Sequence, residues 1–104
     1  MDFNEYQKKA KSFAIYTDHN YPALGLAEET GELLGKLAKA SRDGINDGRE
    51  FALSLKKEAG DVLWMLATLM WEHGIQLDEV AELNIQKLED RKNRNVIKGA
   101  GDNR

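Results

Sequence analysis

Acidic residues stand inside two otherwise apolar segments of this chain, and they limit its possible folds more than any other feature. The acids fall in residues 25–34 and 58–62, and they are Glu28, Glu29, Glu32, Glu58 and Asp61. Each residue of a helix advances by about 100°, so the first three acids share one strip about 100° wide. The last two are three residues apart and also share a face. Both groups therefore point to where a core is expected.

Several carboxylates cannot be buried together without partners, because each would protonate or return to water. A hard divalent cation such as Mg²⁺ or Mn²⁺ takes oxygen ligands and resolves this conflict. Two i,i+3 pairs on facing helices, Glu29 with Glu32 and Glu58 with Asp61, supply four such ligands. Either pair alone would more simply be a solvated helix face. The two together, beside the hydrophobic residues 62–71, favour a metal site.

A third group of polar residues follows in the last predicted helix, spaced as Asn84-x-x-Lys87-x-x-x-Arg91. The complete pattern, Glu28-Glu29-x-x-Glu32, then Glu58-x-x-Asp61, then this group, resembles the signature of the MazG-like nucleoside triphosphate pyrophosphohydrolases. The resemblance covers most of the chain. It implies an all-α, four-helix bundle-like fold that is completed by homo-oligomerisation, as homodimers that often pair into homotetramers.

The resemblance also implies a reaction and the roles of several residues. Water attacks the α-phosphorus of a nucleoside triphosphate and pyrophosphate leaves, so that a monophosphate remains. The cofactor is Mg²⁺, with Mn²⁺ possible, held by Glu29, Glu32, Glu58 and Asp61. Glu28 lies on the same face and could act as general base or bind a second ion.

Substrate contacts are expected from both ends of the chain. Asn84, Lys87 and Arg91 lie within about 80° on a helical projection and could face the acids, where they would bind phosphate oxygens. The alternative is a solvated face paired with nearby acids, and the family motif favours substrate. Lys36 follows the acids by about one turn and could also reach phosphate. An aromatic residue of the first helix stacks on the base in similar proteins; Phe13 is our candidate, with a core position as the alternative.

The chain of 104 residues predicts one helical domain, residues 1–95, followed by a flexible tail, residues 96–104. A single proline and the lack of alternating β-branched runs favour helices over strands. Capping and breaker residues delimit four helices: from a cap at Asp2 to about Tyr16, from Tyr21-Pro22 to about Arg42, from about Arg49 to His73, and from a cap at Asp78 to about Arg94. A loop is expected at Gly44 and residues 46–48. Phe3, Tyr6, Ala10 and Phe13 should face inward.

Composition limits the cellular setting and the partners. There is no cysteine, no signal-peptide pattern at the start and no apolar run long enough for a bilayer, so we expect a cytoplasmic protein without membrane contact. A net charge of −3 argues against binding to a nucleic-acid polymer through a basic surface. Residues 62–70 are apolar nearly all round, and a partner subunit would cover them.

Three functional hypotheses remain open at this stage. The first is a house-cleaning enzyme that hydrolyses unwanted (d)NTP to (d)NMP and pyrophosphate. The second is a dUTPase-like or phosphoribosyl-ATP pyrophosphatase-like activity within the same superfamily. The third is a non-enzymatic metal-binding helical module or a ferritin-like bundle, which would typically use Glu-x-x-His pairs that this chain lacks.

Overall fold

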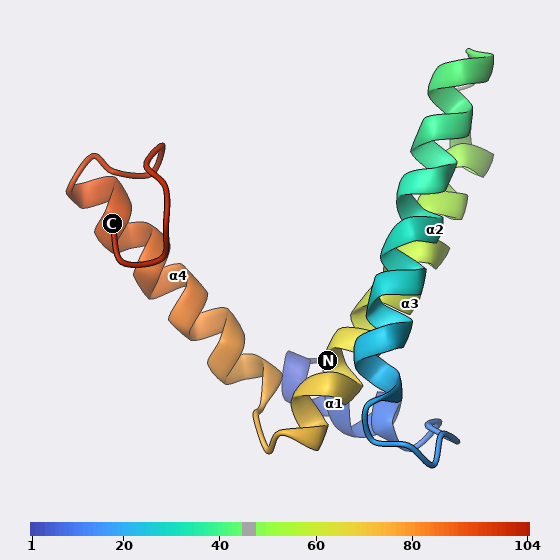
Figure 1. Ribbon diagram of the computed structural model, residues 1–104, viewed down its shortest axis with the longest axis horizontal. Coiled ribbons are helices and arrows are strands. Elements are labelled where there is room, and N and C mark those ends of the chain that lie inside the picture. The colour runs from blue at the N-terminus through green and yellow to red at the C-terminus, as the bar shows by residue number, and fades with distance from the viewer. Residues whose placement is uncertain (45–47) are drawn as a thin grey trace.

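The computed structural model describes residues 1–44 and 48–104, and in these ranges it contains helices and no strands (Figure 1). The helices are α1 (Phe3–Lys11), α2 (Tyr21–Asp43), α3 (Gly48–Glu72) and α4 (Leu77–Asn93). The prediction of an all-α chain is confirmed. The expected loop residues Asn46 and Asp47 lie outside the described ranges.

The helices form a V rather than a closed bundle (Figure 1). Helices α2 and α3 run antiparallel and pack along each other as one arm, and α4 extends away as the other arm. Helix α1 lies at the vertex, where it packs against α3 and the start of α4. One chain alone therefore does not complete the four-helix bundle that we expected, and its completion by a second copy stays a prediction.

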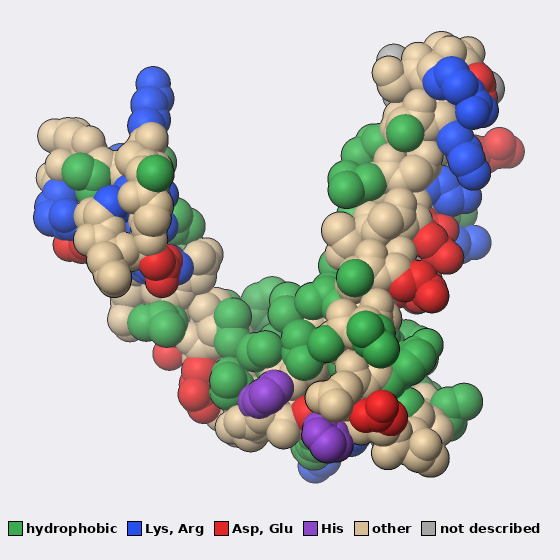
Figure 2. All heavy atoms as spheres, in the orientation of Figure 1, with side chains coloured by type: hydrophobic (Ala, Val, Ile, Leu, Met, Phe, Trp, Pro, Cys, Tyr) green, Lys and Arg blue, Asp and Glu red, His purple; other side chains and the backbone are tan. Residues whose placement is uncertain are grey.

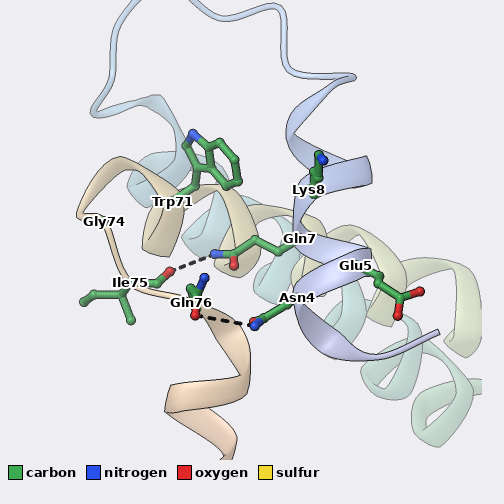
Figure 3. Close-up of a pocket in the computed structure, with 8 residues that line it drawn as sticks. All are labelled: Asn4, Glu5, Gln7, Lys8, Trp71, Gly74, Ile75 and Gln76. Atoms are coloured by element: carbon green, nitrogen blue, oxygen red, sulfur yellow. Dashed lines mark hydrogen bonds between the residues drawn. The ribbon is translucent and has the colours of Figure 1, made fainter.

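A small core and a buried glutamine hold the vertex together. Ala10, Ala67 and Leu77 are buried and pack with the partly buried Tyr6, Trp64 and Met70. Gln7 is only 2% exposed, and its amide nitrogen donates to the carbonyls of Ala67 and Ile75 at 3.0 and 2.9 Å. Figure 3 shows this amide reaching from α1 to the loop before α4. The Gln7 carbonyl oxygen accepts from the Leu77 N–H at 3.1 Å.

The N-terminus of α4 is thus capped from another helix, which corrects the predicted cap at Asp78. Gln76 occupies the N-cap position without a capping side chain, and Asp78 lies one residue inside the helix. Its N–H donates instead to Asn4 of α1 at 3.0 Å. Asn4 and Gln7 together satisfy two of the free N–H groups that every helix start presents. Tertiary contact here replaces the local capping chemistry on which the prediction depended.

Other helix ends agree with the sequence. Asp2 caps α1 by accepting from the Glu5 N–H, Pro22 lies in the first turn of α2, and Gly44 ends α2 with a φ of +74°. That backbone conformation is one that glycine adopts at little cost. Gly74 has a φ of +70° and follows the end of α3 in the same way.

The first helix is shorter than predicted, since it ends at Lys11 and not near Tyr16. The Ser12 N–H lies within hydrogen-bonding distance of the carbonyls of both Lys8 and Lys9, so the chain tightens into a turn. Tyr16 is held outside the helix, where its hydroxyl bonds to Lys11 and Glu72. A local pattern could not reveal this cross-helix contact.

The predicted inward face of α1 is only partly correct. Ala10 is buried and Tyr6 is half-buried, but Phe3 and Phe13 are 46% and 59% exposed. Helix α1 has nine residues and packs one face against the vertex, so it can bury few side chains. Gln7 takes one of those positions because its hydrogen bonds are satisfied there.

Candidate metal and nucleotide site

Three of the predicted metal ligands meet midway along the arm formed by α2 and α3. Glu29 and Glu32 of α2 and Glu58 of α3 each offer a carboxylate oxygen, and these oxygens lie within 4.8 Å of one another. Figure 2 shows acidic side chains gathered on this arm, with basic side chains beyond them toward its tip. The i,i+3 spacing on α2 and the antiparallel packing of α3 bring the three acids together.

Two oxygens of this cluster are buried without a partner. Among the described residues, neither Oε2 of Glu29 nor Oε2 of Glu58 has a hydrogen-bond partner. Burial, and then the neighbouring charges of Glu32 and Asp61, raise the pKa of Glu29 above its usual value. Orphaned carboxylate oxygens that face other carboxylates are what a hard cation would satisfy, so these residues fit Mg²⁺ or Mn²⁺.

Asp61, the fourth predicted ligand, is not part of the group of three. It lies on α3 one turn beyond Glu58 and is partly buried. Its charge still acts on the cluster, since it contributes to the raised pKa of Glu29. It also adds to the effect of burial in raising the pKa of the Tyr6 hydroxyl. Its place as a direct ligand stays a prediction.

A mixed-charge pocket, lined by acids and by two lysines, lies on one side of the acid cluster. It has a volume of about 490 Å³ and is lined by Glu28, Gly31, Glu32, Gly35, Lys36, Lys39 and Glu58. The structure therefore places the predicted general base Glu28 and the predicted phosphate contact Lys36 in one pocket with two of the clustered acids. Gly31 and Gly35 add no side chain, so the pocket stays open along this face of α2.

An aromatic pocket lies on the other side and shares Glu29 with the cluster. It has a volume of about 470 Å³, and its lining includes Tyr16, Tyr21, Trp64 and Met65. The rings of Tyr16 and Tyr21 are stacked, with centroids 5.8 Å apart. A flat apolar ring could enter this pocket and lie against aromatic side chains while its polar substituents reach the acids.

Tyr16 is fixed at the rim of that pocket by charged neighbours. Lys11 Nζ donates to the Tyr16 hydroxyl at 2.9 Å and forms an ion pair with Glu72 at 2.7 Å. Lys11 and then Tyr16 lower the pKa of Glu72, while burial and then Glu72 raise the pKa of Tyr16. Tyr16, Tyr21 and Trp64 line this pocket, and none of them was a predicted base contact. The available signal was a tyrosine before the acid-bearing helix and another at its first residue.

Phe13, the predicted base contact, lies elsewhere. Its side chain is exposed, it does not line the aromatic pocket, and Lys9 Nζ lies 5.7 Å from its ring centroid. Phe13 lies in the turn after α1, directly before the pocket-lining residues 14–18.

The polar strip of α4 does not meet the acids within one chain. Asn84 borders an apolar pocket near the vertex with Leu63 and Leu66 of α3. Lys87 and Arg91 lie farther along α4, on the opposite arm from the acid cluster, and both bind Asp102. Arg91 is 6% exposed. The expectation that this strip faces the acids is therefore not met inside a single chain.

The fold and the site together define an all-α protein with a carboxylate cluster suited to a divalent cation. The MazG nucleotide pyrophosphohydrolase domain matches residues 18–96, so the chain belongs to this family. It is also 37% identical over 116 aligned positions to the Gene 37 protein of Mycobacterium phage L5, with both chains covered completely. No solved structure matches the chain significantly.

Family membership indicates nucleotide pyrophosphohydrolase activity on a nucleotide substrate. The matched region contains all of the clustered acids and the strip on α4, and it ends just before the C-terminal segment. Among the described helices, none is long and apolar enough to cross a membrane.

Proposed function

We propose that this protein is a Mg²⁺-dependent nucleoside triphosphate pyrophosphohydrolase that converts (d)NTP to (d)NMP and pyrophosphate, in nucleotide-pool house-cleaning. The observation that carries the proposal is the cluster of Glu29, Glu32 and Glu58, with two orphaned oxygens, between an aromatic and a mixed-charge pocket. Water adds to the α-phosphorus, the bond from that phosphorus to the bridging oxygen breaks, and pyrophosphate leaves with that oxygen.

The acids divide into ligands and a base. Glu29, Glu32 and Glu58 hold the cation, and Asp61 completes the set from the next turn of α3. A divalent cation there supplies positive charge that polarises a phosphoryl oxygen and makes an attacking water more acidic. Glu28 lines the same pocket as Glu32 and Glu58, and we assign it the proton of that water.

The two pockets bind different parts of the substrate. The nucleobase enters the aromatic pocket beside Tyr16, Tyr21 and Trp64. The phosphates extend past the acids to Lys36 in the mixed-charge pocket. Phe13 remains a predicted base contact, which would require its exposed ring to close over the pocket.

A second copy of the chain brings the strip on α4 into use. By helical geometry Leu83 and Leu88 flank the strip of Asn84, Lys87 and Arg91, and they are 67% and 39% exposed. The arm of α2 and α3 also exposes leucines, namely Leu34, Leu37 and Leu53. Figure 2 shows hydrophobic side chains on the side of this arm that faces α4. Packing of α4 from one copy against this arm of another would cover both surfaces, as a homodimer or a homotetramer.

The test is a pyrophosphate-release assay over canonical and modified nucleoside triphosphates, with Mg²⁺, with Mn²⁺ and with chelator. We expect pyrophosphate and monophosphate only with metal, and loss of turnover in Glu32→Gln and Asp61→Asn with helix content unchanged. Full activity in Glu32→Gln would overturn the metal assignment, and full activity in Asp61→Asn would remove Asp61 from the ligand set. Light scattering of the same samples measures the oligomeric state, and a monomer would contradict the role of the second copy.

Lys87→Ala tests the strip on α4. We expect it to weaken triphosphate binding more than monophosphate binding, because it removes a contact to the distal phosphates. Equal losses for both ligands would argue against that contact.

A further inference from the structure

The cationic strip of α4 is already occupied by a carboxylate of the same chain. Asp102 Oδ1 accepts from Lys87 Nζ at 2.8 Å and from Arg91 Nη2 at 3.0 Å. The same Nη2 also donates to the backbone carbonyl of Asp102 at 2.9 Å. Lys87 and then Arg91 lower the pKa of Asp102. One anionic group thus satisfies both cations at once.

The segment that carries Asp102 folds back on itself through specific bonds. The Arg104 guanidinium donates to the carbonyls of Val96 and Ile97 at 2.9 and 3.1 Å. Gly101 has a φ of +83°, a conformation suited to the turn just before Asp102. Arg94 donates to the carbonyl of Arg104, which ties the segment to the end of α4. These contacts give Asp102 a defined position over the strip.

Burial is unequal across this contact. The side chain of Arg91 is 7% exposed, while that of Asp102 is 76% exposed. Lys87 is 37% exposed, so only one of the two cations is buried, and the carboxylate that bridges them lies at the surface. The pair of Lys87 and Asp102 is solvent-exposed, and such pairs contribute little to stability. The family match ends at residue 96, so the segment lies outside the matched domain.

We propose that residues 97–104 form an intramolecular competitor, in which Asp102 occupies the phosphate-binding cations Lys87 and Arg91 until a triphosphate displaces it. This inference rests on the proposed function, since it takes those two side chains to be substrate contacts. Carboxylate and phosphate oxygens compete for the same Lys and Arg donors. The apparent affinity for triphosphate is then the intrinsic affinity multiplied by the fraction of molecules in which the strip is free. If the strip is free in about one molecule in ten, binding is about tenfold weaker.

The experiment compares Asp102→Asn with wild type in the full chain, using calorimetric titration of inorganic triphosphate with Mg²⁺ present. Asn keeps the size of the side chain and leaves the backbone carbonyl for Arg91, but it removes the charge. We expect triphosphate to bind about 3- to 10-fold more tightly, and KM to fall by the same factor with kcat unchanged. Asp102→Glu should stay close to wild type. Asp43→Asn is the charge-matched control, because Asp43 pairs only with its neighbour Arg42 among the described residues.

Two further measurements separate competition from a structural role. In Lys87→Ala/Asp102→Asn the gain in affinity should shrink, because one of the two released cations is missing. Triphosphate should also increase hydrogen exchange in residues 99–104 of the wild type, since the segment is displaced. A segment that only stabilises α4 would show neither effect.

The outcomes distinguish this inference from the proposed function. Unchanged or weaker triphosphate binding in Asp102→Asn overturns the competitor, even if the wild type releases pyrophosphate. Triphosphate binding that tightens in Asp102→Asn, without pyrophosphate release by any variant, supports the competitor and overturns the hydrolase. Absence of inorganic triphosphate binding in every variant overturns the competitor, and absence of pyrophosphate release from every nucleoside triphosphate overturns the hydrolase.

Discussion

Glu29→Gln should stabilise the metal-free protein and remove its stabilisation by Mg²⁺. The carboxylates of Glu29, Glu32 and Glu58 lie within 4.8 Å of one another. Two unit charges at that distance repel by about 3.5 kcal/mol at an effective dielectric constant near 20, and by about 0.9 kcal/mol in bulk water. Because Glu32 is exposed and its charge is screened by solvent, we expect Glu29→Gln to relieve about 1–2 kcal/mol of repulsion, in the lower part of this range.

The assay is thermal unfolding followed by far-UV circular dichroism, with chelator and with excess Mg²⁺. For a domain of this size that relief raises the midpoint of Glu29→Gln by roughly 5–10 °C in chelator. The wild type should gain about 2.7 kcal/mol when Mg²⁺ reaches about 100 times its dissociation constant, and the variant should gain little. Glu82→Gln, at an exposed position on α4, should change stability by less than about 0.5 kcal/mol.

Two results would refute this reasoning. A lower midpoint of Glu29→Gln in chelator would mean that the carboxylate supports the fold rather than straining it. A Mg²⁺-induced shift in the variant as large as that in wild type would place the cation elsewhere.

Three more predictions follow from the vertex, the helix packing and the site. Gln7→Ala should lower the free energy of unfolding by about 2–4 kcal/mol in chemical denaturation, because three hydrogen bonds are lost, one of which caps α4; a loss below about 0.5 kcal/mol would contradict this role. Gly25→Val should cost about 1–3 kcal/mol, since even a Cβ there would overlap Sδ of the buried Met65; a midpoint equal to that of wild type would show that Met65 moves freely. Because the pKa of Glu29 is raised, its contribution to metal-free stability is present at low pH and is lost as the pH rises through that pKa. Mg²⁺ binds the ionised form, so the Mg²⁺-induced midpoint shift should be larger at pH 7.5 than at pH 5. A shift independent of pH would count against Glu29 as a ligand.

Much of the local structure was predictable because its causes are local. Pro22 and Gly44 delimit α2 through backbone conformations that depend only on the residue type and its neighbours. The i,i+3 spacing of Glu29 and Glu32 places both acids on one face of any helix that contains them, and that face meets Glu58. The MazG family was also recognisable from these residues, and the domain match confirms it.

What depends on contacts between distant segments was not predictable. Polar Gln7 is buried in place of Phe3 and Phe13, because partners for its amide exist only where α1 meets the loop before α4. The same contact supplies the cap that local rules assign to Asp78.

The helices, the acid pairs on their faces and the family follow from the order of residues alone, because helical period and turn chemistry act over a few residues. Long-range packing places Asp61 outside the group of three, makes α4 a separate arm, and brings Asp102 onto Lys87 and Arg91. These outcomes depend on the angle at which helices leave the vertex and on bonds between residues far apart in the chain. Helical spacing specifies which side chains share a face, but the packing of that face decides what it meets.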